Sequence, residues 1–257
     1  MNQPRAGSPR DDQLVVTTAL QDAAVILRIN RPHRLNALNE NLVGALEAAL
    51  TQAHADERRA VILTGTGRAF CAGFDLKEDR DDGGLRQIEA QQRLGALLTS
   101  LPIPVIAAIN GLAVGAGSEI ALACDFLLAA EDSYFSLPEV LIGTGMGGGT
   151  SFLLTRTIGR IKASEFVLLG EPISAADAAA MGLVSRVVPR ENLEAAAEDL
   201  AAKLVSRPPH AIATVKQALF RGLHQSFSDS LAAEFEEVRA AHFHPESVAL
   251  MDAFRHR

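Results

Sequence analysis

The chain has 257 residues, of which 48% are hydrophobic and 21% charged, and its formal net charge at pH 7 is −7. This length and composition predict a globular α/β protein with a sizeable core and argue against a disordered chain. The negative charge argues against a nucleic-acid partner, because there is no overall basic field to hold phosphates.

The first twelve residues, "MNQPRAGSPRDD", are polar and contain no apolar segment. They predict a disordered tail over residues 1–12 rather than a signal peptide, so the expected location is cytoplasmic. Two cysteines, Cys71 and Cys124, are too few for a disulfide framework and are expected to be reduced core residues. No Cys or His spacing suits a metal ion, so no metal site is expected.

Strand and helix patterns begin directly after the tail. The runs "LVVTTAL" and "AVILRIN" predict a hairpin between Leu14 and Asn30. Apolar residues at helical spacing follow, with Asn39 as the predicted N-cap; they are Leu42, Val43, Leu46, Leu50 and Ala53. "AVILTG" then predicts a buried strand, "GRAFCAGFD" a turn, and "LKEDRDDGG" an exposed, mobile loop.

A helix is predicted from about Leu85 to Pro102, followed by a buried strand, "PVIAAING". The stretch "VIAAINGLAVGAGSEIALAC" is long and apolar enough to suggest a membrane span. Asn110, Ser118 and Glu119 would then lie within the bilayer. Its glycines indicate a strand, a tight turn and a helix instead, so no membrane partner is expected.

The repeated order of strand, turn and helix predicts an α/β core over residues 13–190, in which Tyr134 and Phe135 are expected to be buried. From about Glu191 the pattern is wholly helical. Residues 191–257 therefore predict a helical C-terminal region that packs on the core or on a neighbouring subunit.

Two glycine-rich turns invite a nucleotide interpretation that their spacing does not support. "GAGSEI" lacks the third glycine of a dinucleotide motif, and "GTGMGGGT" lacks the Lys of a phosphate loop. Turns at Gly73-Phe74 and Gly115-Ala116 do offer backbone amides, which could donate to one oxygen that becomes negative during a reaction. Ordinary tight turns explain the same residues, and spacing alone does not decide.

Two carboxylates lie in apolar surroundings, Glu119 in "GAGSEIAL" and Glu139 in "SLPEVLIG". Burial and mutual repulsion would raise and separate their pKa values, which suits proton transfer near neutral pH. The alternative is one solvated and one structural glutamate, and periodicity leaves both possibilities open.

Five segments occur in an order that resembles the enoyl-CoA hydratase/isomerase (crotonase) superfamily, with the motifs most similar to those of enoyl-CoA hydratase. They are "RPHRLNALN", "GRAFCAGFDLKE", "PVIAAINGLAVGAGSEIALACD", "FSLPEVLIG" and "ISAADAAAMGLVSRVVP". The resemblance runs from about Leu14 to the last residue. It implies a spiral of ββα units with a C-terminal helical trimerisation region, and a homotrimer or dimer of trimers.

The resemblance also implies a reaction, the reversible hydration of a 2-trans-enoyl-CoA to a 3-hydroxyacyl-CoA. The amides of Phe74 and Ala116 would form an oxyanion hole for the thioester enolate, Glu119 and Glu139 would handle the water, and the Gly147 amide would position it. Coenzyme A is part of the acyl-CoA substrate, so no separate cofactor is expected. A Δ3-Δ2-enoyl-CoA isomerase, another hydroxyacyl-CoA dehydratase and a non-catalytic acyl-CoA binder or scaffold remain alternatives.

Further residues match positions along the substrate and its CoA in the family pattern; they are Arg34, Leu35, Asn36, Ala37, Ala72, Asp75, Leu76, Lys77, Gly115, Phe254 and Arg257. Two departures from the pattern concern the site itself. Phe74 replaces a small residue, so its ring is expected to reshape the acyl pocket. The loop before Gly147 lacks a usual Pro, so it is expected to be more mobile.

Overall fold

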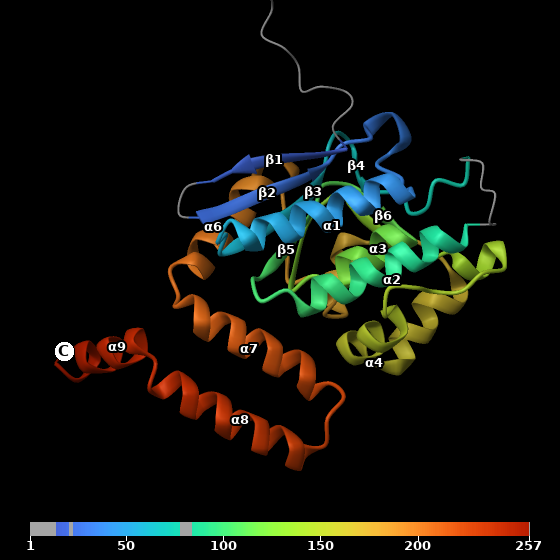
Figure 1. The fold of residues 1–257 in the computed structure, drawn as a ribbon. Helices are drawn as coiled ribbons and strands as arrows, with labels where there is room; N and C mark the ends of the chain where they lie inside the picture. Colours follow the sequence, from blue (N-terminus) through green and yellow to red (C-terminus); the bar gives the residue numbers. More distant parts are fainter. Residues whose placement is uncertain (1–13, 21–22, 78–83, 257) are drawn as a thin grey trace, which may run out of the picture.

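The computed structural model describes residues 14–20, 23–77 and 84–256, which form two β-sheets and the helices around them (Figure 1). The predicted tail and Arg257 lie outside these ranges, as does most of the loop predicted over residues 76–84. None of the helices in the described ranges is long and apolar enough to cross a membrane.

The larger sheet has six strands in the order β1-β2-β3-β5-β7-β10. Their bounds are β1 Val15–Ala19, β2 Ala24–Ile29, β3 Ala60–Gly65, β5 Val105–Ile109, β7 Phe126–Ala130 and β10 Arg186–Val188. β1 and β2 form the predicted antiparallel hairpin, and the remaining neighbours pair in parallel. Parallel strands need long crossover connections, which is where the second sheet and the helices are built.

The smaller sheet has the order β4-β6-β8-β9. Its strands are β4 Ala69–Cys71, β6 Leu112–Val114, β8 Tyr134–Ser136 and β9 Ile173–Ser174. β3, β5 and β7 are each followed by one of these strands and then by a helix, namely α2 Leu85–Ser100, α3 Ala116–Leu122 and α4 Thr150–Leu169. This repeat is the expected spiral of ββα units. β4 and β6 lie where the sequence pattern predicted only turns.

Helices cover both faces of the larger sheet. In β2, Val25 and Leu27 belong to the core cluster beneath α1 (Glu40–Ala55) and α2, whereas Ile26 belongs to a second cluster beneath α6 (Leu193–Val205). Strand side chains alternate between faces, so one strand contributes to both clusters. α1 begins at Asn39 as predicted, since the Asn39 side chain accepts a hydrogen bond from the Leu42 amide.

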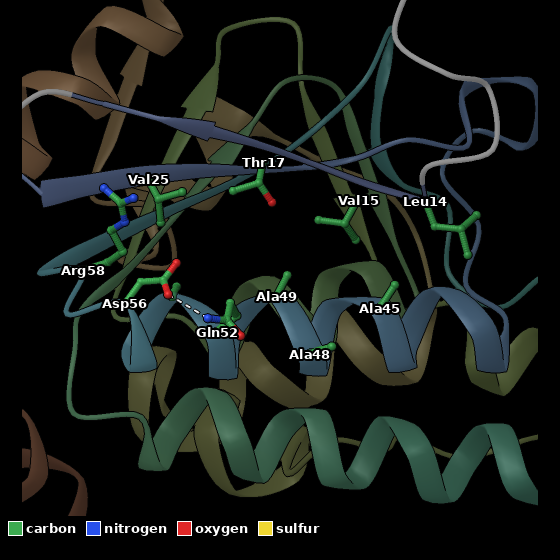
Figure 2. A pocket seen from close by; sticks show the side chains of 11 residues that line it. Leu14, Val15, Thr17, Val25, Ala45, Ala48, Ala49, Gln52, Asp56 and Arg58 are labelled. Atoms are coloured by element: carbon green, nitrogen blue, oxygen red, sulfur yellow. Dashed lines mark hydrogen bonds between the residues drawn. The ribbon is translucent and has the colours of Figure 1, made fainter.

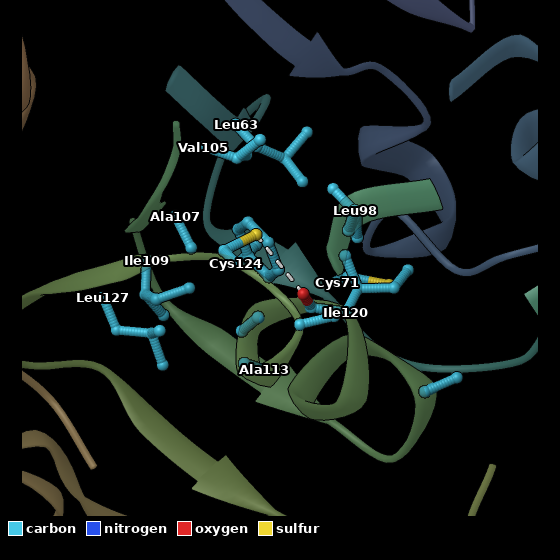
Figure 3. Packing of buried hydrophobic residues seen from close by; sticks show 14 of the residues in the cluster. Leu63, Cys71, Leu98, Val105, Ala107, Ile109, Ala113, Ile120, Cys124 and Leu127 are labelled. Carbon is cyan, nitrogen blue, oxygen red and sulfur yellow. Dashed lines mark hydrogen bonds between the residues drawn. The ribbon is translucent and has the colours of Figure 1, made fainter. Parts of the chain in front are cut away.

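Figure 3 shows the larger cluster around β5 and α3, with both cysteines inside it. Cys71 and Cys124 are buried and unpaired, as expected. Burial raises the pKa of the Cys71 thiol to about 12, so it stays protonated and unreactive at neutral pH. The prediction for Tyr134 is wrong. Phe135 is buried, but Tyr134, the first residue of β8 and on the other side of the strand from Phe135, is 39% exposed.

The last three helices, α7 (Pro209–Gly222), α8 (Phe227–His242) and α9 (Pro245–Arg255), project away from the sheets (Figure 1). Lys216 ties α7 to the core, because its Nζ donates to Asp125 Oδ2 at 2.7 Å and to the Ile103 carbonyl at 2.9 Å. α8 and α9 contain no fully buried residue. The exposed phenylalanines of α8, α9 and the connection between them are Phe227, Phe235, Phe243 and Phe254.

Candidate active site

A cavity of about 370 Å³ lies between α2, the start of α3 and a 3-10 turn, η3 (Glu139–Ile142). The five residues with predicted catalytic roles all line it; they are Phe74, Ala116, Glu119, Glu139 and Gly147. Apolar residues supply much of the remaining described lining, among them Leu76, Ile88, Val114, Ile142 and Met146. The structure thus brings together residues that come from three turns of the spiral.

The two predicted oxyanion amides follow two neighbouring strands, β4 and β6, which pair in parallel. Ala116 is the first residue of α3, where a backbone N–H has no partner within the helix. In the described structure, neither the Phe74 N–H nor the Ala116 N–H donates to a protein acceptor. The two segments are close, since a Cβ at Gly73 would lie 3.4 Å from Ala116 N. The Phe74 side chain packs against the core and also lines the cavity.

Gly115 brings Glu139 close to the first turn of α3. Its φ of +53° lies in the left-handed region that favours glycine, and a Cβ there would lie 2.9 Å from Glu139 Oε1. A side chain at position 115 would therefore displace the Glu139 carboxylate from its place beside this turn. This explains why glycine, predicted as a substrate-binding residue, stands at this point.

Glu119 lies one turn into α3 and is only 3% exposed. Its Oε1 accepts a 2.7 Å hydrogen bond from the Gly147 amide, and its Oε2 accepts one from Gln91 Nε2. Burial raises the pKa of Glu119, and these two donors act in the opposite direction. The Gly147 amide, predicted to position water, here holds the carboxylate.

Glu139 has a different environment. Its Oε2 is buried and has no hydrogen-bond partner among the described residues. Burial raises the pKa of Glu139 to about 7; its own backbone amide opposes the rise, and the charge of Glu119 adds to it. A carboxyl group with this pKa exists in both protonation states near neutral pH, which suits a residue that donates and accepts a proton.

The predicted CoA segment, residues 34–37, is shaped by Asn36. The Asn36 side chain is fully buried, donates to the carbonyls of Thr66 and Ala69, and accepts from the Arg31 amide. It holds the loop together and is not free to bind a ligand. The exposed Arg34 side chain remains available at the surface.

The other predicted binding residues also divide into buried structural residues and residues at the cavity or the surface. Asp75 is buried and pairs with Arg31 at 3.1 Å, so its carboxylate is a structural ion-pair partner. Ala72 and Leu76 line the cavity, whereas Lys77, the residue after Leu76, is exposed and does not line it. Phe254 lies on α9, 78% exposed, and is not part of the cavity.

Sequence reasoning missed Gln91, which contacts Glu119 directly. Gln91 lies on the buried face of α2. A polar residue at a core position of an amphipathic helix was the one signal that could have revealed it.

Two further features lie outside this cavity. A larger cavity of about 630 Å³ lies between the β1–β2 hairpin and α1 (Figure 2). Its lining is rich in alanine, and Asp56, its one described carboxylate, accepts from Gln52 at 2.6 Å. The described residues of that lining include no pair of acidic groups to transfer protons.

The second feature is a cluster of His210, His244 and Glu246, whose potential ligand atoms lie within 4.8 Å of one another. The two imidazole rings stack, with centroids 3.7 Å apart and planes 22° apart. Nitrogen lone pairs lie in the ring plane, so stacked rings do not direct them at a common ion. The arrangement is therefore not a preformed metal site.

The fold and the site define a ββα-spiral protein with two free amides and two buried glutamates around one cavity. The chain belongs to the enoyl-CoA hydratase/isomerase family, whose model matches residues 20–252. This confirms the family and the fold predicted from the sequence.

Relatives and solved structures agree with this assignment. The chain is 40% identical over 225 residues to a putative enoyl-CoA hydratase/isomerase of Bacillus subtilis, covering 86% of each chain. It is 38% identical over 216 residues to the 2,3-dehydroadipyl-CoA hydratase of Escherichia coli, covering 83% of this chain and 85% of the relative. The crystal structure of an enoyl-CoA hydratase from Bacillus anthracis superposes with a TM-score of 0.91 at 34% identity, covering 95% and 96% of the two chains.

Proposed function

We propose that the protein is a hydro-lyase that reversibly hydrates a 2-trans-enoyl-CoA to a 3-hydroxyacyl-CoA. The observation that carries the proposal is the pair of buried glutamates, Glu119 and Glu139, facing one cavity beside two free amides. Similarity to proteins named enoyl-CoA hydratases supports it.

The amides of Phe74 and Ala116 would bind the thioester oxygen. This oxygen gains negative charge as water adds to the β-carbon, so two fixed donors stabilise the enolate more than the ground state. Ala116 is the first residue of α3, where the helix dipole adds a favourable field. Both groups are backbone atoms, so the side chain of Phe74 affects the shape of the pocket rather than the hydrogen bond.

The two glutamates would divide the proton transfers between them. Glu119, held by two donors, keeps lone pairs free to accept a proton from the attacking water. Glu139 would deliver a proton to the α-carbon, because its pKa of about 7 keeps a protonated fraction at neutral pH. Water thus adds as OH at the β-carbon and H at the α-carbon, which leaves Glu119 protonated and Glu139 ionised. Passage of that proton from Glu119 to Glu139 through solvent would restore the starting state, and all steps run backward in dehydration.

CoA would be bound as part of the substrate, without a separate cofactor. Arg34 and Lys77 are exposed cations in the segments predicted to lie along the CoA, and their charge suits the phosphates of the nucleotide. We further propose a homotrimer or a dimer of trimers in the cytoplasm, in which a neighbouring subunit covers the exposed aromatic residues of α8 and α9. In that assembly Phe254 and Arg257 would reach the nucleotide of an adjacent subunit.

One observation favours a second candidate, a Δ3-Δ2-enoyl-CoA isomerase. Such a reaction moves one proton between two carbons and needs only one carboxyl group of suitable pKa, and Glu139 alone meets this requirement. A hydratase needs Glu119 as well. The two activities are therefore separated by the effect of removing Glu119.

The test is an absorbance assay that follows loss of the conjugated enoyl thioester over a series of chain lengths, with 3-enoyl-CoA as the isomerase substrate. Glu119→Gln and Glu139→Gln should each lower hydration by about two orders of magnitude or more. The matched control is Glu131→Gln, at an exposed glutamate outside the cavity. Calorimetric CoA binding with no turnover of any substrate would favour a non-catalytic binder and sink the proposal.

A further inference from the structure

The buried face of α2 carries two glutamines, Gln87 and Gln91, among apolar residues. Burying an amide is unfavourable unless its polar atoms are hydrogen-bonded. Gln87 donates to the Leu38 carbonyl, which fastens α2 to the segment before α1. Gln91, one turn later, donates to a carboxylate of the proposed catalytic pair.

The contact between Gln91 and Glu119 is shielded from solvent, with 2% and 3% of the two residues exposed. Water therefore does not compete with Gln91 Nε2 for Glu119 Oε2. A hydrogen bond to a charged group is stronger in such surroundings. Gly147 holds the other oxygen. The carboxylate plane is thus fixed from two sides, by α2 and by the loop before α4.

Packing also fixes Gln91 itself. A Cβ on Gly147 would lie 3.0 Å from Gln91 Oε1, so the glutamine amide lies directly against this glycine. One turn further along α2, a Cβ on Gly95 would lie 2.7 Å from the Gly148 carbonyl oxygen. α2 and the loop are in close contact at both points, which leaves the Gln91 side chain little freedom to rotate.

We propose that Gln91 is a positioning residue. It holds Glu119 as the carboxylate that accepts a proton from the attacking water, and leaves Glu139 as the group that delivers a proton to the α-carbon. The inference rests on the proposed hydration. Gln91 acts through Glu119, so its amide needs no contact with the reacting atoms.

The charges around Glu119 are simple. Among the described residues, the charged group coupled to it is Glu139, from η3, whose own pKa the Glu119 charge raises. α2 offers the neutral Gln91, and the loop and first turn of α4 offer the neutral Gly147 and Thr150. Removal of the Gln91 donor should therefore raise the pKa of Glu119 and leave the rest of the field unchanged.

Gln91→Leu tests the proposal, with Gln92→Leu as the matched control at an exposed position of the same helix. In Gln91→Leu we expect kcat for hydration to fall about 10- to 100-fold with little change in KM. The acid limb of the pH profile should move up by about 1 to 2 pH units. A merely structural residue would lower activity and thermal midpoint together without moving the profile, and that result would overturn the proposal.

Gln91→Glu provides a second variant of the same shape if Gln91→Leu does not fold. The introduced carboxyl can donate to Glu119 while it is protonated and repels Glu119 once it ionises. We expect partial activity at acid pH that falls steeply as the pH rises. A profile parallel to that of the wild type would contradict the assigned role.

A titration without substrate separates the two proposals. In protein labelled with ¹³C at glutamate carboxyls, the Glu119 signal is assigned by its absence in Glu119→Gln. Its titration should move up in Gln91→Leu and stay unchanged in Gln92→Leu. If the wild type hydrates no enoyl-CoA, the proposed function fails. The Gln91–Glu119 contact is then tested by the titration alone, and an unchanged pKa of Glu119 in Gln91→Leu would refute its proposed role.

Discussion

Glu139→Gln should change how stability depends on pH. The pKa of Glu139 is raised from 4.5 to about 7 in the folded protein, so the folded state binds this proton more tightly than the unfolded chain. The stabilisation is complete below about pH 4.5 and is lost as the pH rises through 7. At 1.36 kcal/mol per pKa unit the shift corresponds to about 3 kcal/mol. Solvent in the open cavity screens the group, so we expect about 1–2 kcal/mol.

The assay is urea unfolding followed by circular dichroism at pH 5 and pH 8, at one protein concentration. Glutamine cannot ionise, so the variant should keep the stability that the wild type loses between these pH values. The difference in free energy of unfolding, variant minus wild type, should be about 1–2 kcal/mol larger at pH 8 than at pH 5. Glu131→Gln, at an exposed position, should behave like the wild type. An equal difference at both pH values would refute the reasoning that Glu139 is destabilised in its charged form.

Three further predictions concern a close packing contact, a helix cap and a buried ion pair, each measured by urea unfolding at neutral pH. Gly117→Ala should cost about 1–3 kcal/mol, because its Cβ would lie 2.2 Å from a carbonyl oxygen of β4; Gly44→Ala, with nothing within 4 Å, should not destabilise. Asn39→Ala should cost about 1 kcal/mol by removing the cap of α1; an unchanged midpoint would contradict that role. Lys216→Met should cost about 3–5 kcal/mol by leaving Asp125 without its cation; restoration by the added mutation Asp125→Asn would identify the unpaired charge as the cause.

Local patterns predicted the parts of the fold that depend on local spacing. The β1–β2 hairpin and the strand β3 show β-type runs, and α1 shows a clear apolar stripe with Asn39 before it. β4 and β6 have three residues each, too few to display an alternation of two. β8 is equally short, so the exposure of Tyr134 at its first position could not be told from the burial of Phe135 beside it.

The candidate site shows the same division. The apolar surroundings of Glu119 and Glu139 made them candidates, the resemblance to the family assigned them a shared role, and the structure places both at one cavity. The role of a polar side chain depends on partners far away in the chain. Asn36 matched a ligand-binding segment, yet its amide is occupied by Thr66 and Ala69. Gln91 could be connected to Glu119 only once the packing of α2 against α3 was known.

The contact between Gly117 and the carbonyl at the end of β4 has a consequence for the order of folding. It joins two successive turns of the spiral, and contacts between distant residues form more slowly than helices because a long loop must close first. Before β4 meets β6, the amides of Phe74 and Ala116 share no acceptor position. During refolding, binding competence should therefore return with the closure of the spiral, after most of the helical signal has recovered.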